Sequence, residues 1–574
     1  MNIPRPEHPK PQMMREEWLN LNGEWDFEID NAQSGIDREL YRADKPLSGK
    51  ILVPFCPEST LSGVHHTDFI YGLVYRRTFD LPESWAEGRT RLHFGAVDYE
   101  CTVYINEKAV GTHAGGHVSF SFDISRYLVA GENRIAVFVR DDTRDDRVPS
   151  GKQSQRFASH GCYYTRTTGI WQTVWLEHMP DAHVKWVHYY TDAENAAVTL
   201  VGETCGAGTL RACATYKGRA VGQGEVASRG GRFTLTLPLS ERHLWEIGHG
   251  RLYDLTLTYG EDRVQSYFGL RSVSLDKQRF LFNGRSVFLR LILDQGYYPD
   301  GILTAPSDAE LEGDIRRSMA CGFNGARLHQ KIFEERYLYH CDRLGYLVWS
   351  EFPDWGLDGS QLDSLYRILP EWLEEAARDF NHPSIVTWCL RNESRRGQIP
   401  EPIHMLYRTM RAVDPTRPCI DSSGWIHVET DIYDIHNYEQ DPAVLQKTLE
   451  GLYNPDVRGE KYLGYGGHDG PGFPQQYAYD RPFVLSEYGG ISYRKGEGAW
   501  GYGRNAESEE EFYERFAGLT RVILENPAIC GFCYTQLTDV EQEQNGLYTF
   551  GREPKFDAAR LRAIVASPAA IEKE

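Results

Sequence analysis

The hydrophobic pattern of this chain changes its period near residue 272. Before that point, short runs with polar and apolar residues in alternation, such as GEWDFEI, YRRTFDL and RIAVFVRDD, follow one another with turn residues between them. After it, nearly continuous apolar runs alternate with amphipathic segments of helical length. The first pattern is typical of antiparallel sheets, and the second is typical of parallel sheets covered on both faces. A chain of 574 residues is therefore expected to hold an all-β part followed by an α/β part.

The all-β part is long enough for two sandwiches. Residues 1–179 contain six or more short strands without a helical pattern between them, which predicts a jelly-roll-like sandwich of the kind that binds sugars. Residues 180–272 continue with shorter strands, among them GTLRACATYKG and RFTLTLPLS, and predict an immunoglobulin-like sandwich of about 90 residues.

Residues 273–574 are expected to form a catalytic (β/α)8 barrel. Its eight apolar runs are SVFLRLILDQ, FNGARLHQ, YLVWSEFPDW, IVTWCLRNES, CIDSSG, DIYDIHNY, PFVLSEYGG and ICGFCYTQLTD. Amphipathic segments such as SDAELEGDIRRSMACG separate most of them, as in a TIM barrel. The fifth and sixth runs follow each other closely, so the fifth crossover is expected to lack a clear helix.

Bulk composition excludes several classes of function. A net charge of −20 disfavours nucleic acids and anionic membrane surfaces as partners. The sequence has no stretch of 18 apolar residues and no signal-peptide pattern, which predicts a cytoplasmic protein. Eleven cysteines, an odd number, indicate reduced thiols rather than a disulfide framework, and the single CxxC at Cys530 and Cys533 lacks the four ligands of a zinc site. No phosphate loop or dinucleotide fingerprint occurs, so ATP and NAD chemistry are not expected.

Polar and aromatic residues follow nearly every strand of the predicted barrel. In such barrels, side chains at the carboxyl ends of the strands converge on one mouth, where catalysis takes place. Carboxylates, amides and aromatic rings together suit the binding of sugar hydroxyls and sugar faces. For Trp355, Trp500 and Tyr534 core packing is the alternative to stacking on a sugar. The candidate substrate-binding residues at this mouth are Asp294, Arg327, His329, Glu351, Trp355, Asn392, Asn437, Trp500 and Tyr534.

Two carboxylates on opposite sides of the mouth are candidates for catalysis. Glu393 follows the fourth strand and Glu487 follows the seventh. Hydrolysis of a glycosidic bond needs such a pair, one carboxyl group as general acid and one ionised carboxylate as nucleophile or base. The alternative is that each glutamate caps a helix or pairs with an arginine.

The domain order and several segments resemble glycoside hydrolase family 2 over essentially the whole chain. The similar segments are GCYYTRTTGIWQTVWLE, LDQGYYPDG, GFNGARLHQK, RNES, LSEYGG and TQLTDVEQEQNGLY. The resemblance implies a retaining exo-β-glycosidase that acts by double displacement and needs no organic cofactor. Carried over by position, Glu487 would be the nucleophile, Glu393 the acid/base and Tyr438 the residue that holds the nucleophile. Asn392 would meet the sugar 2-hydroxyl, and Arg327 and His329 would line the pocket.

Two departures from the family pattern bear on the substrate. β-Glucuronidases of the family hold the sugar carboxylate with an Asn-x-Lys motif, where this chain has Glu543-Gln544-Asn545. The residues after Asn392-Glu393-Ser394 are Arg395 and Arg396 rather than Trp-Gly. An arginine beside the acid/base would depress its pKa unless a substrate carboxylate offset the charge, and guanidinium matches a carboxylate well. The alternative is that both arginines point to solvent or bridge to acidic residues.

These observations predict a hydrolase for terminal β-linked hexuronic acids, with β-D-galacturonide favoured over β-D-glucuronide because the Asn-x-Lys motif is missing. The alternative enzyme is a β-galactosidase for neutral β-galactosides, in which Arg395 and Arg396 would have no ligand role. A carbohydrate-binding protein without catalysis is the alternative from another class. The expected partners are a small glycoside substrate and further copies of the chain in a homo-oligomer, with no nucleic acid, membrane or metal.

Overall fold

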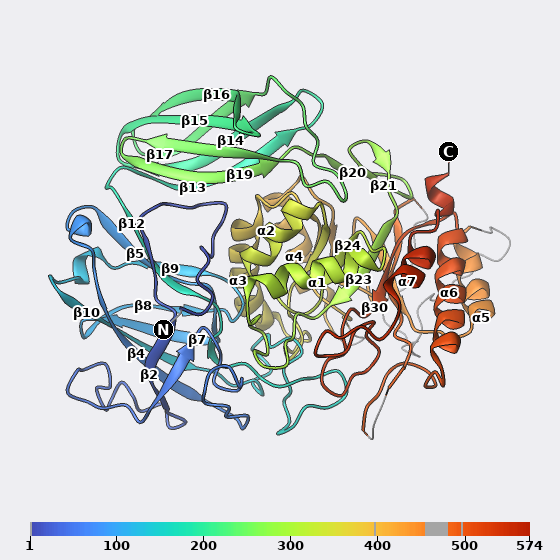
Figure 1. Cartoon of the computed structure of the whole chain (residues 1–574), viewed down its shortest axis with the longest axis horizontal. Coiled ribbons are helices and arrows are strands. Elements are labelled where there is room, and N and C mark those ends of the chain that lie inside the picture. The colour runs from blue at the N-terminus through green and yellow to red at the C-terminus, as the bar shows by residue number, and fades with distance from the viewer. Residues whose placement is uncertain (1–2, 395–397, 454–479, 495–497, 574) are drawn as a thin grey trace.

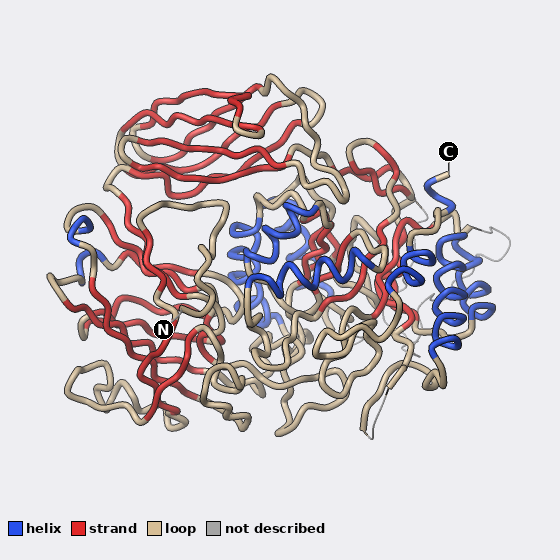
Figure 2. Tube along the Cα trace, viewed as in Figure 1, coloured by secondary structure: helices blue, strands red, loops and turns tan. Residues whose placement is uncertain are grey.

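The chain forms three bodies in the order that the sequence predicts. The computed structural model describes residues 3–394, 398–453, 480–494 and 498–573. Figure 1 shows two sandwiches of strands, blue to teal and green, beside a body in which yellow to red helices surround a central sheet. Figure 2 shows the same separation, with helices gathered around the third body. Among the described residues no helix is long and apolar enough to cross a membrane.

The first sandwich consists of antiparallel sheets whose strands alternate in burial. In β5, for example, every second side chain from Arg89 to Phe94 is buried, because one face of the sheet packs on the core and the other does not. The four-stranded sheet has the order β1 (Trp18–Asn20), β12 (Val174–Met179), β5 (Arg89–Phe94) and β9 (Phe120–Asp123). The six-stranded sheet has the order β3 (Gly49–Val53), β2 (Gly23–Ile29), β4 (Gly72–Asp80), β10 (Glu132–Arg140), β7 (Glu100–Ile105) and β8 (Lys108–Ala114). A small ladder joins β6 (Val97–Asp98) to β11 (Gly169–Ile170).

The second sandwich is smaller and has its own core. Its three-stranded sheet has the order β13 (His183–Asp192), β14 (Ala197–Cys205) and β17 (Gly231–Pro238). Its four-stranded sheet has the order β16 (Arg219–Ser228), β15 (Gly208–Tyr216), β18 (Leu252–Tyr259) and β19 (Asp262–Gly269). A meander of β20 (Val273–Asp276), β21 (Arg279–Phe282) and β22 (Arg285–Ser286) then leads into the barrel.

Eight parallel strands form the barrel, and most of their residues are buried because helices cover the outer face. Their order is β27 (Cys419–Ile420), β26 (Ile385–Cys389), β25 (Leu347–Glu351), β24 (Gly325–Leu328), β23 (Leu289–Asp294), β30 (Ile529–Thr535), β29 (Phe483–Gly489) and β28 (Tyr433–Asn437). Side chains from the segment after β27 contact β28: the Ser423 hydroxyl donates to Asp434 at 2.5 Å, and His427 lies 2.8 Å from both Asp421 and the backbone carbonyl oxygen of Asp434. The prediction of two sandwiches followed by a (β/α)8 barrel is confirmed.

The barrel helices begin and end where local chemistry favours it. Ser307 caps α1 by accepting from the backbone N–H of Glu310, and α2 ends at Gly345, which has a positive φ of 71°. No helix lies between β27 and β28, as expected from the short fifth crossover. The helix after β28 was not predicted, although Asp441-Pro442 is a typical helix start. The α-helices in the described part of the chain are α1 (Asp308–Ala320), α2 (Glu335–Leu344), α3 (Leu365–Asp379), α4 (Pro400–Val413), α5 (Pro442–Leu449), α6 (Glu509–Glu525) and α7 (Ala558–Val565).

All eleven cysteines carry free thiols, as expected for a reduced protein. Cys530 and Cys533 of β30 are fully buried among Leu289, Leu347 and other apolar residues at the centre of the barrel. They therefore contribute to packing. The division of the chain at 179 and 272 stays a proposal.

Candidate active site

Glu393 and Glu487 come together at the carboxyl ends of the barrel strands. One carboxylate oxygen of each residue and one ring nitrogen of His436 all lie within 4.8 Å of one another. His436 Nδ1 is 2.8 Å from Glu393 Oε1 and 3.4 Å from Glu487 Oε2. The two carboxyl groups thus face each other across one imidazole, with Glu393 more exposed than Glu487.

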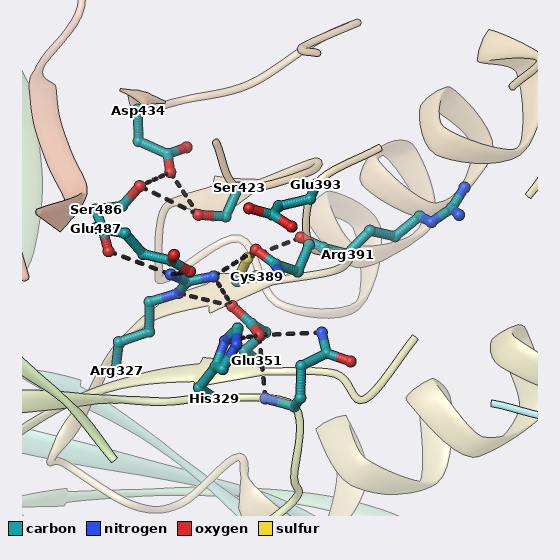
Figure 3. A network of polar contacts seen from close by, with 12 residues as sticks. Arg327, His329, Glu351, Cys389, Arg391, Glu393, Ser423, Asp434, Ser486 and Glu487 are labelled. Carbon is teal, nitrogen blue, oxygen red and sulfur yellow. Dashed lines mark hydrogen bonds and ion pairs between the residues drawn. The ribbon is translucent and has the colours of Figure 1, made fainter. Parts of the chain in front are cut away.

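Arg327 holds the floor of the site (Figure 3). Its fully buried guanidinium donates to Glu487 Oε1 and to the Asn392 side-chain oxygen, each at 2.7 Å. The same group donates to Glu351 Oε2, and His329 Nδ1 lies 2.8 Å from the other oxygen of Glu351. A planar guanidinium with its donors occupied in this way fixes the orientation of both Glu487 and Asn392.

Glu487 is held in its ionised form. Burial by itself would raise the pKa of this carboxyl group, but electrostatic interaction with the neighbouring His436 and Arg327 and a hydrogen bond from the Tyr438 hydroxyl outweigh burial and lower the pKa to about 2. Tyr438 also lies 3.1 Å from Thr535 Oγ1, and its ring stacks on Tyr502 with centroids 3.4 Å apart. The carboxylate is therefore charged and immobile.

The backbone turns sharply at Glu393. Its φ is 54°, a left-handed conformation that is uncommon for glutamate, and its N–H donates to the carbonyl of Ser423 at 2.8 Å. The preceding residue, Asn392, donates its own N–H to Asp354 at 2.9 Å. The Asn392 side-chain nitrogen has no hydrogen-bond partner among the described residues. It is the group of Asn392 that a sugar hydroxyl could use.

The other predicted site residues divide into two sets. Trp355 and Trp500 lie at the mouth, where both join the barrel to the first sandwich. The backbone carbonyl of Trp355 accepts from the N–H groups of Ser150 and Gly151, and the indole N–H of Trp500 donates to the carbonyl of Gly161. Asp294 instead accepts from the Gly296 N–H and the Tyr337 hydroxyl, and Tyr534 packs on Tyr488 and Phe516. These last two side chains contact helix α2 or α6 rather than the carboxylate pair, because alternate residues near a strand end point to opposite faces of the sheet.

Of three further predicted site residues, the structure describes one. Asn437 accepts from the backbone N–H of Glu439 at 3.0 Å, so its side chain stabilises the turn after β28. Arg395 and Arg396 lie outside the described residues.

Glu393, His436 and Glu487 are the one group of acidic, histidine and cysteine side chains, among the described residues, that is close enough to hold a metal ion. The same closeness is what a pair of glycosidase carboxylates requires.

Two stretches of the chain match sequence profiles of one enzyme family. Residues 67–180 match the sugar binding domain of glycosyl hydrolases family 2, and residues 307–517 match the TIM barrel domain of the same family. The two stretches together exceed half of the chain. The chain belongs to glycoside hydrolase family 2. It is accordingly a glycoside hydrolase.

Relatives of this family 2 chain include two kinds of enzyme. A β-glucuronidase of Paenibacillus borealis is 25% identical over 97% of this chain and 98% of its own length. A β-galactosidase of Thermoanaerobacter pseudethanolicus is 26% identical over 70% of this chain and 55% of its own length. Among solved structures, Lactobacillus rhamnosus β-glucuronidase matches with a TM-score of 0.80 at 19% identity, covering 99% of this chain and 100% of that one. The structural match shows the same fold.

In this family 2 chain, the segment Glu543–Asn545 takes part in a ring of hydrogen bonds. The Tyr164 hydroxyl donates to Glu543 at 2.5 Å, and the Asn545 amide donates to the other Glu543 oxygen at 3.0 Å. Gln536 donates to Asn545 at 2.7 Å, and Gln295 donates to both Gln536 and Tyr164. The ring joins the first sandwich to the barrel at the place where the sequence lacks the Asn-x-Lys motif.

Sequence reasoning did not assign a role to His436 or to the residues behind it. His436 Nε2 lies 3.2 Å from the hydroxyl of Ser423, which donates to the buried carboxylate of Asp434. Ser486 donates to the same carboxylate. His436 stands one residue before the predicted Asn437, so its position at a strand end was the available signal. Its contact with both glutamates could not be read from the sequence because it depends on the pairing of β28 with β29.

Proposed function

We propose that this enzyme is a retaining exo-β-glycosidase that removes terminal β-linked hexuronic acids from small glycosides. The separation of Glu393 and Glu487 carries the proposal. Oxygens of the two carboxyl groups lie within 4.8 Å, whereas inverting glycosidases hold their carboxyl groups about 6.5–9.5 Å apart to admit a water and retaining enzymes hold them at about 5–5.5 Å. The observed closeness supports direct attack by a carboxylate.

In the proposed double displacement, Glu487 attacks the anomeric carbon while Glu393 gives its proton to the departing glycosidic oxygen. The bond to the aglycone breaks as the glycosyl–Glu487 ester forms. Glu393, now ionised, takes a proton from water, whose oxygen attacks the anomeric carbon and releases Glu487. Arg327 and Tyr438 hold the nucleophile, and Asn392 presents its unpartnered side-chain nitrogen to the sugar.

The uronide assignment rests on two supports. The Paenibacillus relative that matches over nearly its full length is named a β-glucuronidase. Arg395 and Arg396 follow the proposed acid/base in the sequence, separated from it by Ser394 alone, and are proposed to bind the sugar carboxylate. A preference for galacturonide over glucuronide is proposed because Glu543–Asn545 stands where glucuronidases of the family have Asn-x-Lys. Hydrolysis of neutral β-galactosides is the alternative, and the β-galactosidase relative favours it.

A four-substrate assay tests the proposal. Hydrolysis of p-nitrophenyl β-D-galacturonide, glucuronide, galactoside and glucoside is measured with the wild type, Arg395→Ala, Arg396→Ala and Glu487→Gln. We expect the highest kcat/KM on the galacturonide, a β-anomer as the first product by NMR, and no turnover by Glu487→Gln. Highest activity on the galactoside, unchanged in both arginine variants, would refute the uronide assignment. An α-anomer as first product would refute retention.

A further inference from the structure

Lys152 is a buried lysine that the catalytic mechanism does not use. Only 6% of its surface is exposed, yet none of the ion pairs formed by the described residues includes it. Its ammonium group lies 3.8 Å from the centre of the Trp355 ring, one of the predicted sugar-binding residues. Burying an ammonium group without a carboxylate partner is energetically unfavourable, so a buried lysine that forms no ion pair indicates a binding or catalytic role.

The first sandwich holds Lys152 rigidly over the barrel. The loop between β10 and β11, teal in Figure 1, extends from the sandwich to the barrel. The N–H groups of Ser150 and Gly151 donate to the carbonyl of Trp355 at 2.8 and 3.0 Å, and Gln153 donates to the buried Asp98 at 2.7 Å. Lys152 is thus anchored on both sides in the sequence.

The surroundings of the ammonium group belong to the active site. Burial by itself would lower the pKa of Lys152, but electrostatic interaction with four acidic groups outweighs burial and raises it. These groups are the side chains of Cys162, Glu543, Glu487 and Glu393. The charge of Lys152 in turn helps burial to lower the pKa of His329 well below its usual value. Lys152 therefore remains charged, within electrostatic reach of both proposed catalytic glutamates.

The other buried cations near the mouth are already occupied, as far as the described residues show. Arg327 is bound to Glu351, Glu487 and Asn392. Arg391 pairs with Asp354 at 3.1 Å, and Lys331 donates to two backbone carbonyls at 2.7 Å. Of these four cations, Lys152 is the one that, as far as the described residues show, can bind an anionic partner without losing an existing one.

We propose that Lys152 binds the carboxylate of the substrate's uronic acid, so that the first sandwich supplies a specificity residue to the barrel. This inference rests on the proposed uronide substrate. The Trp355 ring holds the ammonium group by a cation–π contact while the site is empty. Lys152, from the first sandwich, would take the place of the lysine of the Asn-x-Lys motif, where this chain has Asn545.

The test compares each variant on a uronide and on its neutral counterpart. Lys152→Met, Lys152→Arg and wild type are assayed on p-nitrophenyl β-D-galacturonide and galactoside, and on the glucuronide and glucoside. We expect Lys152→Met to lower kcat/KM on the preferred uronide about 100-fold or more, because a buried charge partner is lost, and to change the neutral sugar less than about threefold. Lys152→Arg should retain more uronide activity than Lys152→Met. Lys217→Met is a matched control, since Lys217 also lies over an aromatic ring, that of Tyr216 at 5.5 Å, but on an exposed hairpin of the second sandwich.

The outcomes separate this inference from the proposed function. Uronide hydrolysis by the wild type together with an equal loss on both sugars in Lys152→Met would overturn the role of Lys152 and leave the uronide assignment standing. An unchanged Lys152→Met with a collapse in Arg395→Ala or Arg396→Ala would also overturn it. A wild type that cleaves neutral sugars and no uronide would overturn the proposed substrate, and the inference with it.

Discussion

Glu393 and Glu487 carry the same carboxyl group but meet different neighbours. Glu487 receives hydrogen bonds from Arg327 and Tyr438, while Glu393 contacts His436 and keeps part of its side chain exposed. A fixed, charged carboxylate suits a nucleophile, and a partly accessible one suits a group that exchanges protons with water. The assignment of the two roles therefore follows from the contacts of each residue.

Azide distinguishes the two roles. In Glu393→Ala, we expect deglycosylation of a p-nitrophenyl substrate to slow by about 100-fold or more, because the general base is missing. Azide needs no base, so it should restore turnover and yield the β-glycosyl azide. In Glu487→Ala, azide could only replace the nucleophile, and the product would be the α-azide. Mass spectrometry and NMR of the products decide, and an α-azide from Glu393→Ala would reverse the assignment.

Tyr438→Phe should shift the pH dependence. The Tyr438 hydroxyl stabilises ionised Glu487, so its loss should raise the pKa of Glu487 from about 2 and move the acid limb of kcat/KM to higher pH. Because the folded pKa is depressed, ionised Glu487 stabilises the fold above the unfolded pKa of about 4.3, and that contribution disappears as the pH falls toward 2.

Tyr488→Phe is the control for this pH profile. Tyr488 is buried on β29, the strand that carries Glu487, but its hydroxyl lies 2.8 Å from Thr520 of α6 and does not contact Glu487. An acid limb that moves equally in both variants would contradict the role of the Tyr438 hydroxyl.

At the scale of elements, the loop between β10 and β11 makes close backbone contacts with the barrel. Gly151 has a φ of 57°, and a Cβ at this position would lie 2.5 Å from the carbonyl oxygen of Gln330. The close backbone approach lets both Ser150 and Gly151 donate to Trp355. The position of Lys152 therefore depends on a glycine at residue 151.

Gly151→Ala should both destabilise the protein and reduce activity. Gly161 in the same loop offers a matched control, because its φ is 54° but nothing lies within 4 Å of an added Cβ. Each substitution should cost about 1–2 kcal/mol for the left-handed backbone, and Gly151→Ala should cost more because of the clash. Denaturant unfolding measures the difference, and the uronide-to-neutral ratio of kcat/KM should fall in Gly151→Ala alone. Equal effects of the two variants would contradict this account of the loop.

At the scale of the whole molecule, polar contacts join the two sandwiches and the barrel. Tyr164 of the first sandwich binds Glu543 of the barrel, and Trp500 donates to the carbonyl of Gly161. The segment before β1 adds contacts, with Arg15 pairing with Asp262 of the second sandwich at 2.7 Å and Arg5 pairing with Glu334 of the barrel. We therefore expect the sandwiches and the barrel to unfold together.

Tyr164→Phe should weaken that coupling. The loss leaves Glu543 and Gln295 each short of a buried partner, at a cost of about 1–3 kcal/mol. Tyr189→Phe is the control, because its buried hydroxyl donates to Ser266 within the second sandwich at 2.7 Å. Calorimetry should show a single transition in the wild type that broadens or splits in Tyr164→Phe more than in Tyr189→Phe. A split transition in the wild type would contradict the coupling.

The sequence by itself determined the fold and the place of the proposed chemistry. The period of a hydrophobic pattern, two residues in a strand and about 3.6 in a helix, arises from local backbone geometry. The change of this period near residue 272 therefore predicts two sandwiches followed by a barrel. Glu393 and Glu487 could be chosen because parallel strands end at one mouth. Both inferences need only the order of residues along short segments.

Only the tertiary structure decided which side chains face the sugar. Asp294 and Tyr534 were candidates by position, but the pleat of the barrel turns them toward α2 and α6. Lys152 was not a candidate, because it meets Trp355 about 200 residues later in the chain and only through the docking of a sandwich loop. Contacts between distant segments depend on the packing of whole domains, which no local pattern encodes.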